Sequence, residues 1–246
     1  MQHTANITEI FSSLQGEGVY TGEPTLFVRF SQCAMKCAWC DTAHALCDRS
    51  MCRVTAPDGL AVHEVVNPLS ATALNEILTP YSARMLSVTG GEPLEQAEFL
   101  TEWLPSINHR HTILLETNGV RWEELKAVAP FVHIVSMDFK LPSSAGCGPM
   151  WKAHEAFLRT ALSAGREIYV KIVVTERTTD KDIQETIGII AKINKFIPVI
   201  VQPASRTLTF HDVISPQRLA SIDRVVSAYL PNVSVAHQMH KEWGIQ

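Results

Sequence analysis

The sequence predicts an α/β protein, folded as a partial, open barrel of mostly parallel strands. Apolar runs of strand length alternate with amphipathic segments of helix length. Strands separated by such helices pair in parallel through right-handed crossovers. We count about seven strands and six main helices, a little short of a closed eightfold barrel. The 246 residues suffice for one large α/β core, so we expect a single domain over 1–246.

The first predicted strand, 25–30, is a short apolar and β-branched run that follows a Gly-Glu-Pro turn. Residues 41–69 contain several turn signals and little periodicity, so we expect an irregular excursion there, with room for one short strand. Ser70 is a suitable N-cap for a helix over 71–81. The remaining strands are expected at 85–89, 112–116, 132–137, 167–174, 197–201 and 233–236, and the remaining helices at 96–104, 122–128, 151–163, 180–193 and 216–230.

Three cysteines, Cys33, Cys37 and Cys40, stand in one short loop directly behind the first predicted strand. Iron–sulfur cubes normally take four cysteine ligands, so three thiolates leave one iron open to an external ligand. The alternative is a closed zinc site with Cys47 as the fourth ligand. Zinc motifs usually pair two short hooks far apart in sequence, which favours the cluster. We expect the other cysteines to be ordinary thiols: Cys47, Cys52 and Cys147.

The composition limits the classes of partner. The chain has 21 Lys and Arg against 25 Asp and Glu, a net charge of −4, without the basic excess of a protein that binds the phosphate backbone. No apolar stretch approaches the ~20 residues that span a bilayer, and the first residues lack a signal-peptide pattern. We therefore expect a cytoplasmic protein that contacts neither nucleic acid nor membrane.

Motif-like segments follow the predicted strands, at the edge where parallel α/β sheets bind their ligands. Gly90-Gly91-Glu92-Pro93 follows the second strand, and its glycines would let a ligand approach the backbone. Read alone, the tetrapeptide is equally an ordinary strand-to-helix turn with Pro93 at the helix start.

Two further strands end in polar residues. Glu116, which precedes an Asn-Gly turn, offers a carboxylate that could accept hydrogen bonds from ribose hydroxyls. Ser136, Asp138 and Lys140 follow at the end of the next strand, where the simple alternative is a solvated polar loop.

The spacing of the three cysteines, with the aromatic Trp39 before the last of them, resembles the radical S-adenosylmethionine (SAM) superfamily. The resemblance implies a radical SAM core in which SAM chelates the open iron of a [4Fe-4S] cluster. One electron then splits SAM and frees a 5′-deoxyadenosyl radical. The cofactor-binding residues that the resemblance implies are Trp39, Gly90, Gly91, Glu92, Glu116, Ser136, Asp138 and Lys140.

A narrower resemblance, to the 7-carboxy-7-deazaguanine synthases, comes from Leu-Gln-Gly-Glu-Gly at 14–18, from Phe-Val-Arg-Phe at 27–30 and from Gln-Met-His-Lys at 238–241. It implies a lyase that contracts the ring of 6-carboxy-5,6,7,8-tetrahydropterin, releases ammonia and serves queuosine and 7-deazapurine biosynthesis. No catalytic side chain is assigned, because cluster and SAM generate the radical. Thr42 is the implied ligand of a Mg²⁺ ion. The implied substrate residues are Leu14, Gln15, Gly16, Glu17, Arg29, Thr89, His240 and Gln246.

Two parts of this assignment have simple alternatives. Arg29 suits a substrate carboxylate because its planar fork pairs bidentately, but it could instead be a buried strand arginine paired with Glu17. We expect the tail at 237–246 to fold over the site mouth and to complete the pterin pocket from the side opposite Gln15. The alternative is a tail that only packs Trp243 on the outside of the sheet. Many relatives have Ser-Pro-Lys where this chain has the longer Ser-Met-Asp-Phe-Lys, which affects the matches at 136–140.

Two other functions compete with this reading. One is a short radical SAM activase that installs a glycyl radical on a partner protein, and the other is a non-enzymatic iron–sulfur or zinc scaffold. The expected partners are the small-molecule pterin and an electron donor such as flavodoxin or ferredoxin. Homodimers are the commonest assemblies and occur in the resembling family, so we expect one here.

Overall fold

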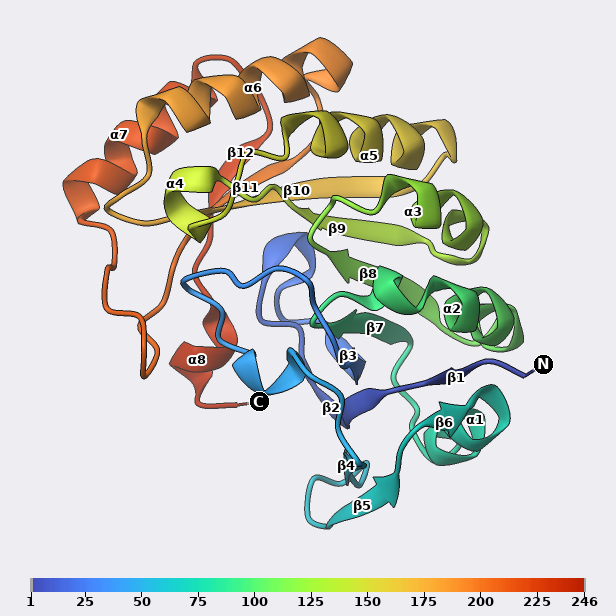
Figure 1. The fold of residues 1–246 in the computed structure, drawn as a ribbon. Coiled ribbons are helices and arrows are strands. Elements are labelled where there is room, and N and C mark those ends of the chain that lie inside the picture. Colours follow the sequence, from blue (N-terminus) through green and yellow to red (C-terminus); the bar gives the residue numbers. More distant parts are fainter. Residues whose placement is uncertain (1, 246) are drawn as a thin grey trace.

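A ten-stranded sheet forms the centre of the computed structural model, which describes residues 2–245. The strand order is β12-β11-β10-β9-β8-β7-β3-β2-β4-β5. The first seven strands in that order all pair in parallel and curve into an open half-barrel (Figure 1). The predicted class, an open and mostly parallel α/β architecture, is confirmed. The seven strands are β3 (Pro24–Phe30), β7 (Met85–Gly90), β8 (Thr112–Thr117), β9 (Ile134–Asp138), β10 (Glu167–Val174), β11 (Val199–Pro203) and β12 (Val233–Val235).

The six predicted main helices are also present. Ser70 caps the first of them by accepting a hydrogen bond from the Ala73 N–H at 3.2 Å. That helix ends at Leu78, before the predicted 81, because Pro80 follows. The helices are α1 (Ala71–Leu78), α2 (Ala97–Trp103), α3 (Trp122–Val128), α5 (Trp151–Ser163), α6 (Asp180–Asn194) and α7 (Pro216–Ser227), with a short extra helix α4 (Pro142–Ala145).

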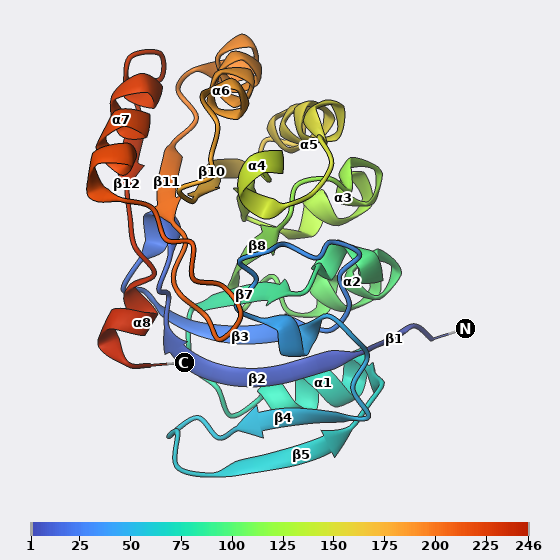
Figure 2. The ribbon, with the colours of Figure 1, turned by 60° about the vertical axis from the view of Figure 1, so that its left-hand side comes forward.

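Most helices cover only the outer face of the sheet. Helices α2, α3, α5 and α6 stand in a row along it (Figure 2). The main apolar core lies between them and the sheet, where the rings of Phe30, Phe99 and Trp103 pack together. The inner face is thereby left for the cysteine loop and the chain's tail. No helix among residues 2–245 is long and apolar enough to cross a membrane.

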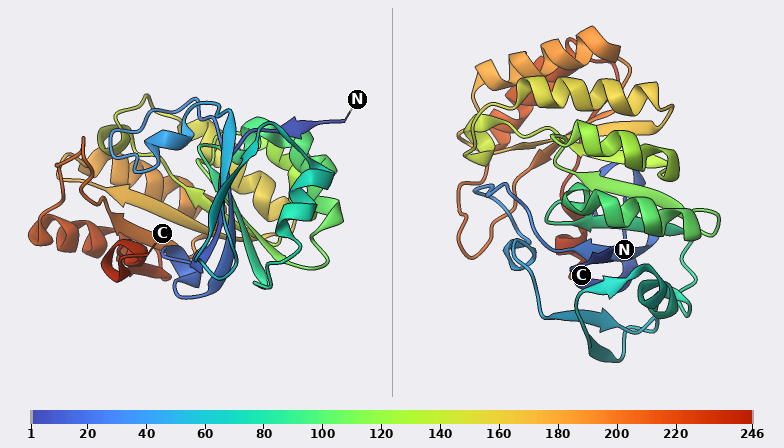
Figure 3. Two further views of the ribbon diagram at one scale, coloured as in Figure 1. Left: turned by 90° about the horizontal axis from the view of Figure 1, so that it is seen from below. Right: turned by 45° about the vertical axis from the view of Figure 1, so that its right-hand side comes forward.

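The N-terminal third contains more strand than the sequence predicts. β2 (Ile7–Leu14) runs antiparallel to β3, and β4 (Met51–Thr55) and β5 (Val62–Val66) form a hairpin that extends the sheet (Figure 3, right). Two-residue strands β1 (Thr4–Ala5) and β6 (Leu69–Ser70) pair beside it. The expectation of an irregular excursion over 41–69 with room for one short strand is therefore wrong from Met51 onward, whereas 41–50 contain no strand. β4 is held by parallel pairing with β2, a contact between distant residues that local patterns do not reveal.

Inward-facing residues of strands β7 to β11 form three layers, because side chains two positions apart on a strand share a face. The deepest is an apolar cluster, which we name the floor layer: Met85, Leu114, Ile134, Tyr169 and Ile200. Two positions further along each strand comes a polar set, the middle layer: Ser87, Glu116, Ser136, Lys171 and Gln202. Two positions further still is the mouth layer at the strand ends: Thr89, Asn118, Asp138, Val173 and Ala204.

Candidate active site

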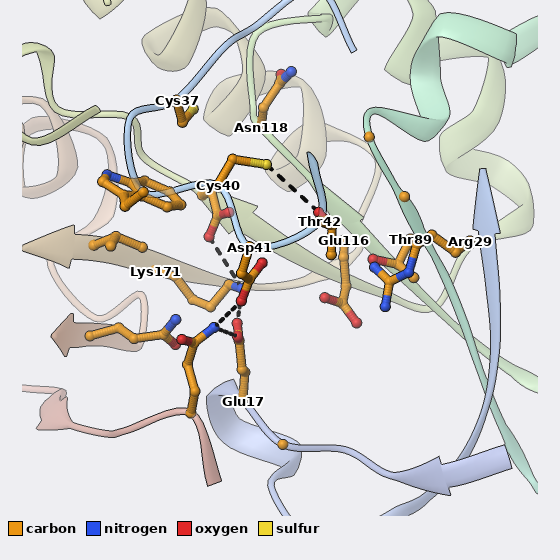
Figure 4. Close-up of a pocket in the computed structure, with 18 of the residues that line it drawn as sticks. Glu17, Arg29, Cys37, Cys40, Asp41, Thr42, Thr89, Glu116, Asn118 and Lys171 are labelled. Carbon is orange, nitrogen blue, oxygen red and sulfur yellow. Dashed lines mark hydrogen bonds and ion pairs between the residues drawn. The ribbon is translucent and has the colours of Figure 1, made fainter. Parts of the chain in front are cut away.

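A cavity opens at the carboxyl ends of the parallel strands, between the sheet, the cysteine loop, the segment after β2 and the tail (Figure 4). It is lined by the whole mouth layer and by Glu116, Lys171 and Gln202 of the middle layer. Most residues selected from the sequence meet there: Leu14, Gln15, Gly16, Glu17, Arg29, Cys33, Cys37, Trp39, Cys40, Thr42, Thr89, Gly90, Gly91, Glu116, Asp138, Lys140 and His240. Glu92 and Ser136 do not line the cavity, and Gln246 lies outside the described residues.

The cysteine loop fits a cluster with one open iron. Cys33, Cys37 and Cys40 all line the cavity, whereas Cys47 is exposed and Cys52 is buried on β4. None of the three remaining cysteines lines the cavity. The arrangement therefore offers three thiols to the site and argues against Cys47 as a fourth ligand.

Gly91 holds this loop against the end of β7. Its N–H donates to the Phe30 carbonyl at 3.0 Å, and the next N–H, of Glu92, donates to the Gln32 carbonyl at 2.7 Å. A Cβ on Gly91 would lie 2.1 Å from the Gln32 oxygen, so only glycine allows this approach. One role of the glycine motif is thus to position the cysteine loop.

Glu92 joins two strand ends from within the protein. Its side chain is fully buried and accepts hydrogen bonds from the Thr117 hydroxyl at 2.8 Å and from the Asn118 N–H at 2.7 Å. Burial raises the pKa of its carboxyl to about 7 despite these bonds. Its contacts are with the protein, which differs from the ligand contact implied for it by resemblance.

Trp39 forms an apolar surface beside the cysteines. It packs with Val173, Ala204 and Phe210, and its indole N–H donates to the Ser144 hydroxyl at 3.0 Å. The Lys140 ammonium lies 4.5 Å from the centre of the Trp39 ring. A flat, apolar ring of a ligand would find a stacking surface at this point.

The middle layer adds charged groups below the strand ends. Glu116 accepts hydrogen bonds from the Ser87 hydroxyl at 2.6 Å and from the Gln15 amide at 3.0 Å. Ser136 is 1% exposed, beneath the mouth layer, so the structure does not bring it to the cavity surface.

Lys171 is a site residue that sequence reasoning missed. Its ammonium is buried and lies 2.6 Å from Glu17 and 3.3 Å from Asp138, and Asp138 also pairs with Lys140 at 2.7 Å (Figure 4). Burial alone would raise the pKa of Glu17, but the charge and hydrogen bond of Lys171, together with a hydrogen bond from Gln238, lower that pKa to about 2. Both partners are therefore charged at neutral pH. The sequence signal that could have identified it is a single lysine within the otherwise apolar segment 168–174.

Arg29 has a partner, but it is not Glu17. Its Nε donates to Glu9 at 2.7 Å, and both side chains are largely buried. Burial alone would raise the pKa of Glu9, yet hydrogen bonds from His44 and Arg29 lower it to about 2. The contact uses one of five guanidinium N–H groups, so the fork keeps donors for a second carboxylate. The alternative of an Arg29–Glu17 pair is wrong.

The tail reaches the site, as predicted. Gln238 donates to Glu17 at 2.6 Å, and the short helix α8 (Met239–Trp243) begins with an N–H bond to the Gly16 carbonyl at 2.9 Å. A Cβ on Gly16 would lie 2.3 Å from the His240 ring. The tail therefore packs on the Gly16–Glu17 segment itself, and the expectation that it approaches from the side opposite Gln15 is wrong.

Asp41 and Thr42 connect the cysteine loop to the tail. The Asp41 carboxylate accepts hydrogen bonds from Lys241 at 2.8 Å and from Gln238 at 2.9 Å. Ligand atoms of Asp41, Glu17 and His240 lie within 4.8 Å of one another, a donor set able to hold a cation. The Thr42 hydroxyl lies 3.8 Å from the Cys40 sulfur and lines the same cavity.

Comparisons with known proteins agree with this geometry. Residues 14–140 match a family described as a 4Fe-4S single cluster domain. A 7-carboxy-7-deazaguanine synthase from Geobacter sulfurreducens is 35% identical over 98% of this chain and 97% of its own length. One from Thermoplasma acidophilum is 32% identical over 96% of this chain and 95% of its own.

Solved structures support the fold. The crystal structure of QueE from Escherichia coli superposes with a TM-score of 0.60 at 21% identity, covering 96% of this chain and 95% of that one. A radical SAM methyltransferase from Sphaerobacter thermophilus gives 0.58 at 13% identity, covering 94% and 77%.

The open α/β half-barrel and its three-cysteine cavity define a radical SAM enzyme, which carries a [4Fe-4S] cluster and uses SAM. Within that class, the full-length similarity is decisive. The chain belongs to the 7-carboxy-7-deazaguanine synthase family.

Proposed function

We propose that this enzyme converts 6-carboxy-5,6,7,8-tetrahydropterin to 7-carboxy-7-deazaguanine and ammonia, a step toward queuosine and other 7-deazapurines. The reaction is a lyase step without net oxidation or reduction, since loss of ammonia alone accounts for the difference between substrate and product. The observation that carries the proposal is that Arg29 lines the same cavity as the three cysteines. A cation suited to the substrate's carboxylate is thereby placed in the cavity of the cluster loop.

When bound, the cluster and SAM supply the radical that removes hydrogen from the pterin. The protein's part is to hold and enclose the reactants. We infer that Cys33, Cys37 and Cys40 hold the cluster and that Trp39 packs against SAM. Arg29 pairs with the substrate carboxylate, and Glu9 fixes its fork by the 2.7 Å contact. The α8 tail covers the substrate side and limits the access of water.

The polar residues at 14–17 and the mouth layer have supporting roles. We assign Leu14, Gln15, Gly16, Glu17, Thr89 and His240 to the substrate, and Gly90, Gly91, Asp138 and Lys140 to SAM. Glu116 bonds to Gln15, which supports a role nearer the substrate than the SAM ribose. Glu92 acts by positioning, through the strand ends that it joins. We keep Gln246 and Ser136 as expectations from resemblance only.

A Mg²⁺ ion at Thr42 belongs to the same proposal. Thr42 supplies a hydroxyl oxygen, and the neighbouring Asp41 carboxylate belongs to a cluster of possible ligand atoms. Oxygen ligands suit this hard cation. The chain would act as one domain and as a homodimer in the cytoplasm, where reducing conditions keep its six free cysteines available. A flavodoxin or ferredoxin would deliver the electron.

Purified enzyme with a reconstituted cluster tests the function directly. Given SAM, a reductant and the carboxypterin, it should form 7-carboxy-7-deazaguanine and ammonia in equal amounts, detected by mass spectrometry and an ammonia assay. Release of 5′-deoxyadenosine without any deazaguanine would refute the proposal. Glycyl-radical formation on an added protein would instead favour an activase.

Arg29→Lys gives a matched test of the carboxylate contact. Lysine keeps the charge but loses the paired donors, so binding of the pterin should weaken by about 1–3 kcal/mol. SAM affinity should stay nearly constant. Equal losses of SAM and pterin affinity in calorimetry would contradict the assignment.

A further inference from the structure

The short helix α4 packs directly against the cysteine loop, although none of the motifs selected from the sequence includes it. The Ala38 N–H, between Cys37 and Trp39, donates to the Ala145 carbonyl at 2.8 Å. The Trp39 indole N–H donates to the Ser144 hydroxyl at 3.0 Å. Two successive residues of the loop are therefore held by the last two residues of α4.

The Ser144 hydroxyl is fixed by a second hydrogen bond. The side chain is 4% exposed, and its hydroxyl donates to the Val173 carbonyl at 2.6 Å. A hydroxyl has one proton and two acceptor positions, so a proton directed at Val173 leaves an oxygen lone pair for the Trp39 N–H. Ser144 therefore links the cysteine loop to β10 near the end of that strand.

Helix α6 anchors α4 in turn. The Asp182 carboxylate, which is largely buried, accepts hydrogen bonds from the Ser143 N–H at 2.8 Å and from the Ser143 hydroxyl at 2.5 Å. These bonds depend on the protein alone, so Ser144 is in place before SAM binds. A contact that is ordered in advance costs less conformational entropy when the ligand arrives.

The contact with Ser144 also selects one orientation of the Trp39 ring, because only one edge of an indole carries the N–H. Lys140 lies 4.5 Å from the ring centre, and three apolar side chains pack against the ring. Contacts of these kinds are open to either flipped orientation of the ring. The hydrogen bond to Ser144 exists in only one of them, and the other orientation would lose it.

We propose that Ser144 is a positioning residue, which holds Trp39 in the orientation that packs against SAM. Ser144 does not itself line the cavity, so it acts through the tryptophan. The inference rests on the proposed contact between Trp39 and SAM and deepens it, since it names the residue that sets the ring's orientation. The simple alternative is a buried serine that contributes only to the stability of the fold.

Ser144→Ala in the cluster-loaded enzyme removes the acceptor with little change in volume. We expect the dissociation constant of SAM, measured by calorimetry, to rise about threefold to tenfold, the equivalent of one hydrogen bond. Ser144→Thr keeps the hydroxyl and should bind SAM within about twofold of wild type. Ser106→Ala is the matched control, because that hydroxyl also accepts from a side-chain N–H, of Asn75, and donates to a backbone carbonyl, of Trp103, away from the cavity. It should leave SAM affinity unchanged.

A double-mutant cycle with Trp39→Phe tests the route of the effect. Phenylalanine keeps an aromatic ring but lacks the N–H, so Trp39→Phe should itself weaken SAM binding. Adding Ser144→Ala to it should then change the dissociation constant by less than about twofold, because the contact is already lost. Equal fold-changes in the wild-type and Trp39→Phe backgrounds would overturn the proposal. A lower unfolding temperature for Ser144→Ala with unchanged SAM affinity would also overturn it, in favour of a role in stability alone.

Electron paramagnetic resonance of the reduced cluster gives a readout that does not depend on turnover. Titration with SAM should change the spectrum of wild type and of Ser144→Ala in the same way, but at a higher SAM concentration in the variant. These measurements need no pterin, so failure of wild type to convert the carboxypterin would refute the proposed function separately. Unchanged SAM affinity in Trp39→Phe would instead overturn the present inference.

Discussion

The mouth layer and the middle layer lie two residues apart on the same strands, yet their polar groups are satisfied by different parts of the chain. In the mouth layer, Asp138 pairs with Lys140, only two residues away. In the middle layer, Glu116 bonds to Gln15 across 101 residues, and Lys171 bonds to Glu17 across 154. Asp138 thus has one local partner, Lys140, besides Lys171 of the middle layer at 3.3 Å, whereas Glu116 and Lys171 bind the distant Gln15–Glu17 segment. We assign the first mainly to the cofactor and the second to the substrate.

Removing a cluster ligand at the mouth of the cavity should have the largest effect. Cys37→Ala should abolish both the cluster and all turnover, because two remaining thiols of the loop cannot hold a cube. Iron analysis and the visible absorption of the reconstituted protein would measure this loss. Changing Cys47, Cys52 or Cys147 to Ala should leave the iron content intact, and an equally complete loss from any of them would show that the ligand assignment is wrong.

A substitution in the middle layer should lower the stability of the fold more than the rate of the reaction. Lys171→Met leaves the Glu17 carboxylate buried without its counter-ion, so the free energy of unfolding should fall by about 3–5 kcal/mol. Denaturant unfolding of the apo-protein would measure it. Lys152→Met, at an exposed lysine on α5, is the control and should change stability by less than about 0.5 kcal/mol. Similar values for the two variants would argue against a buried charge network.

Removing the tail tests the substrate side of the cavity separately from the cluster, because α8 contacts the substrate side. Deletion of residues 239–246 should raise the Michaelis constant for the pterin roughly tenfold to hundredfold, since several hydrogen bonds are lost. The absorption of the cluster and the cleavage of SAM alone should not change. Wild-type turnover by the truncated enzyme would show that the tail only packs.

The smallest expected effect concerns Glu9 at the edge of the site. Its pKa in the folded protein, about 2, lies below its ordinary value of 4.5. Its ion pair therefore stabilises the fold fully above pH 4.5, and this contribution is lost as the pH falls toward 2. Glu9→Gln should make the dependence of unfolding free energy on pH shallower in that window, by at most about 1.4 kcal/mol per pH unit. An unchanged slope would contradict the lowered pKa.

Sequence patterns predicted the parallel half of the fold and selected the cysteine loop together with Thr89 and Asp138 of the mouth layer. The seven parallel strands are apolar runs between helices, and the cysteine loop is a local motif, so both can be read within short windows. The β4–β5 hairpin was not predicted because β4 is held by β2, more than 40 residues earlier in the chain, and β5 pairs only with β4.

Lys171 and Gln202 were not selected from the sequence, for a related reason. Each is a single polar residue within an apolar strand, and its meaning depends on the face it occupies and on what lies opposite. Only the packed strands show that both point into one cavity with Glu116. Arg29 was selected from the sequence and lines the cavity, but its partner Glu9 lies across an antiparallel pairing that the sequence did not predict.

The contact between Gln238 and Glu17 spans 221 residues and sets an order of events during synthesis. At about 5–20 residues per second, a ribosome needs roughly 10–40 s to pass from Cys40 to Gln238. Throughout that interval the nascent chain carries its three cluster cysteines without the tail that contacts Glu17 and Asp41. The cavity therefore cannot be completed until translation has almost ended.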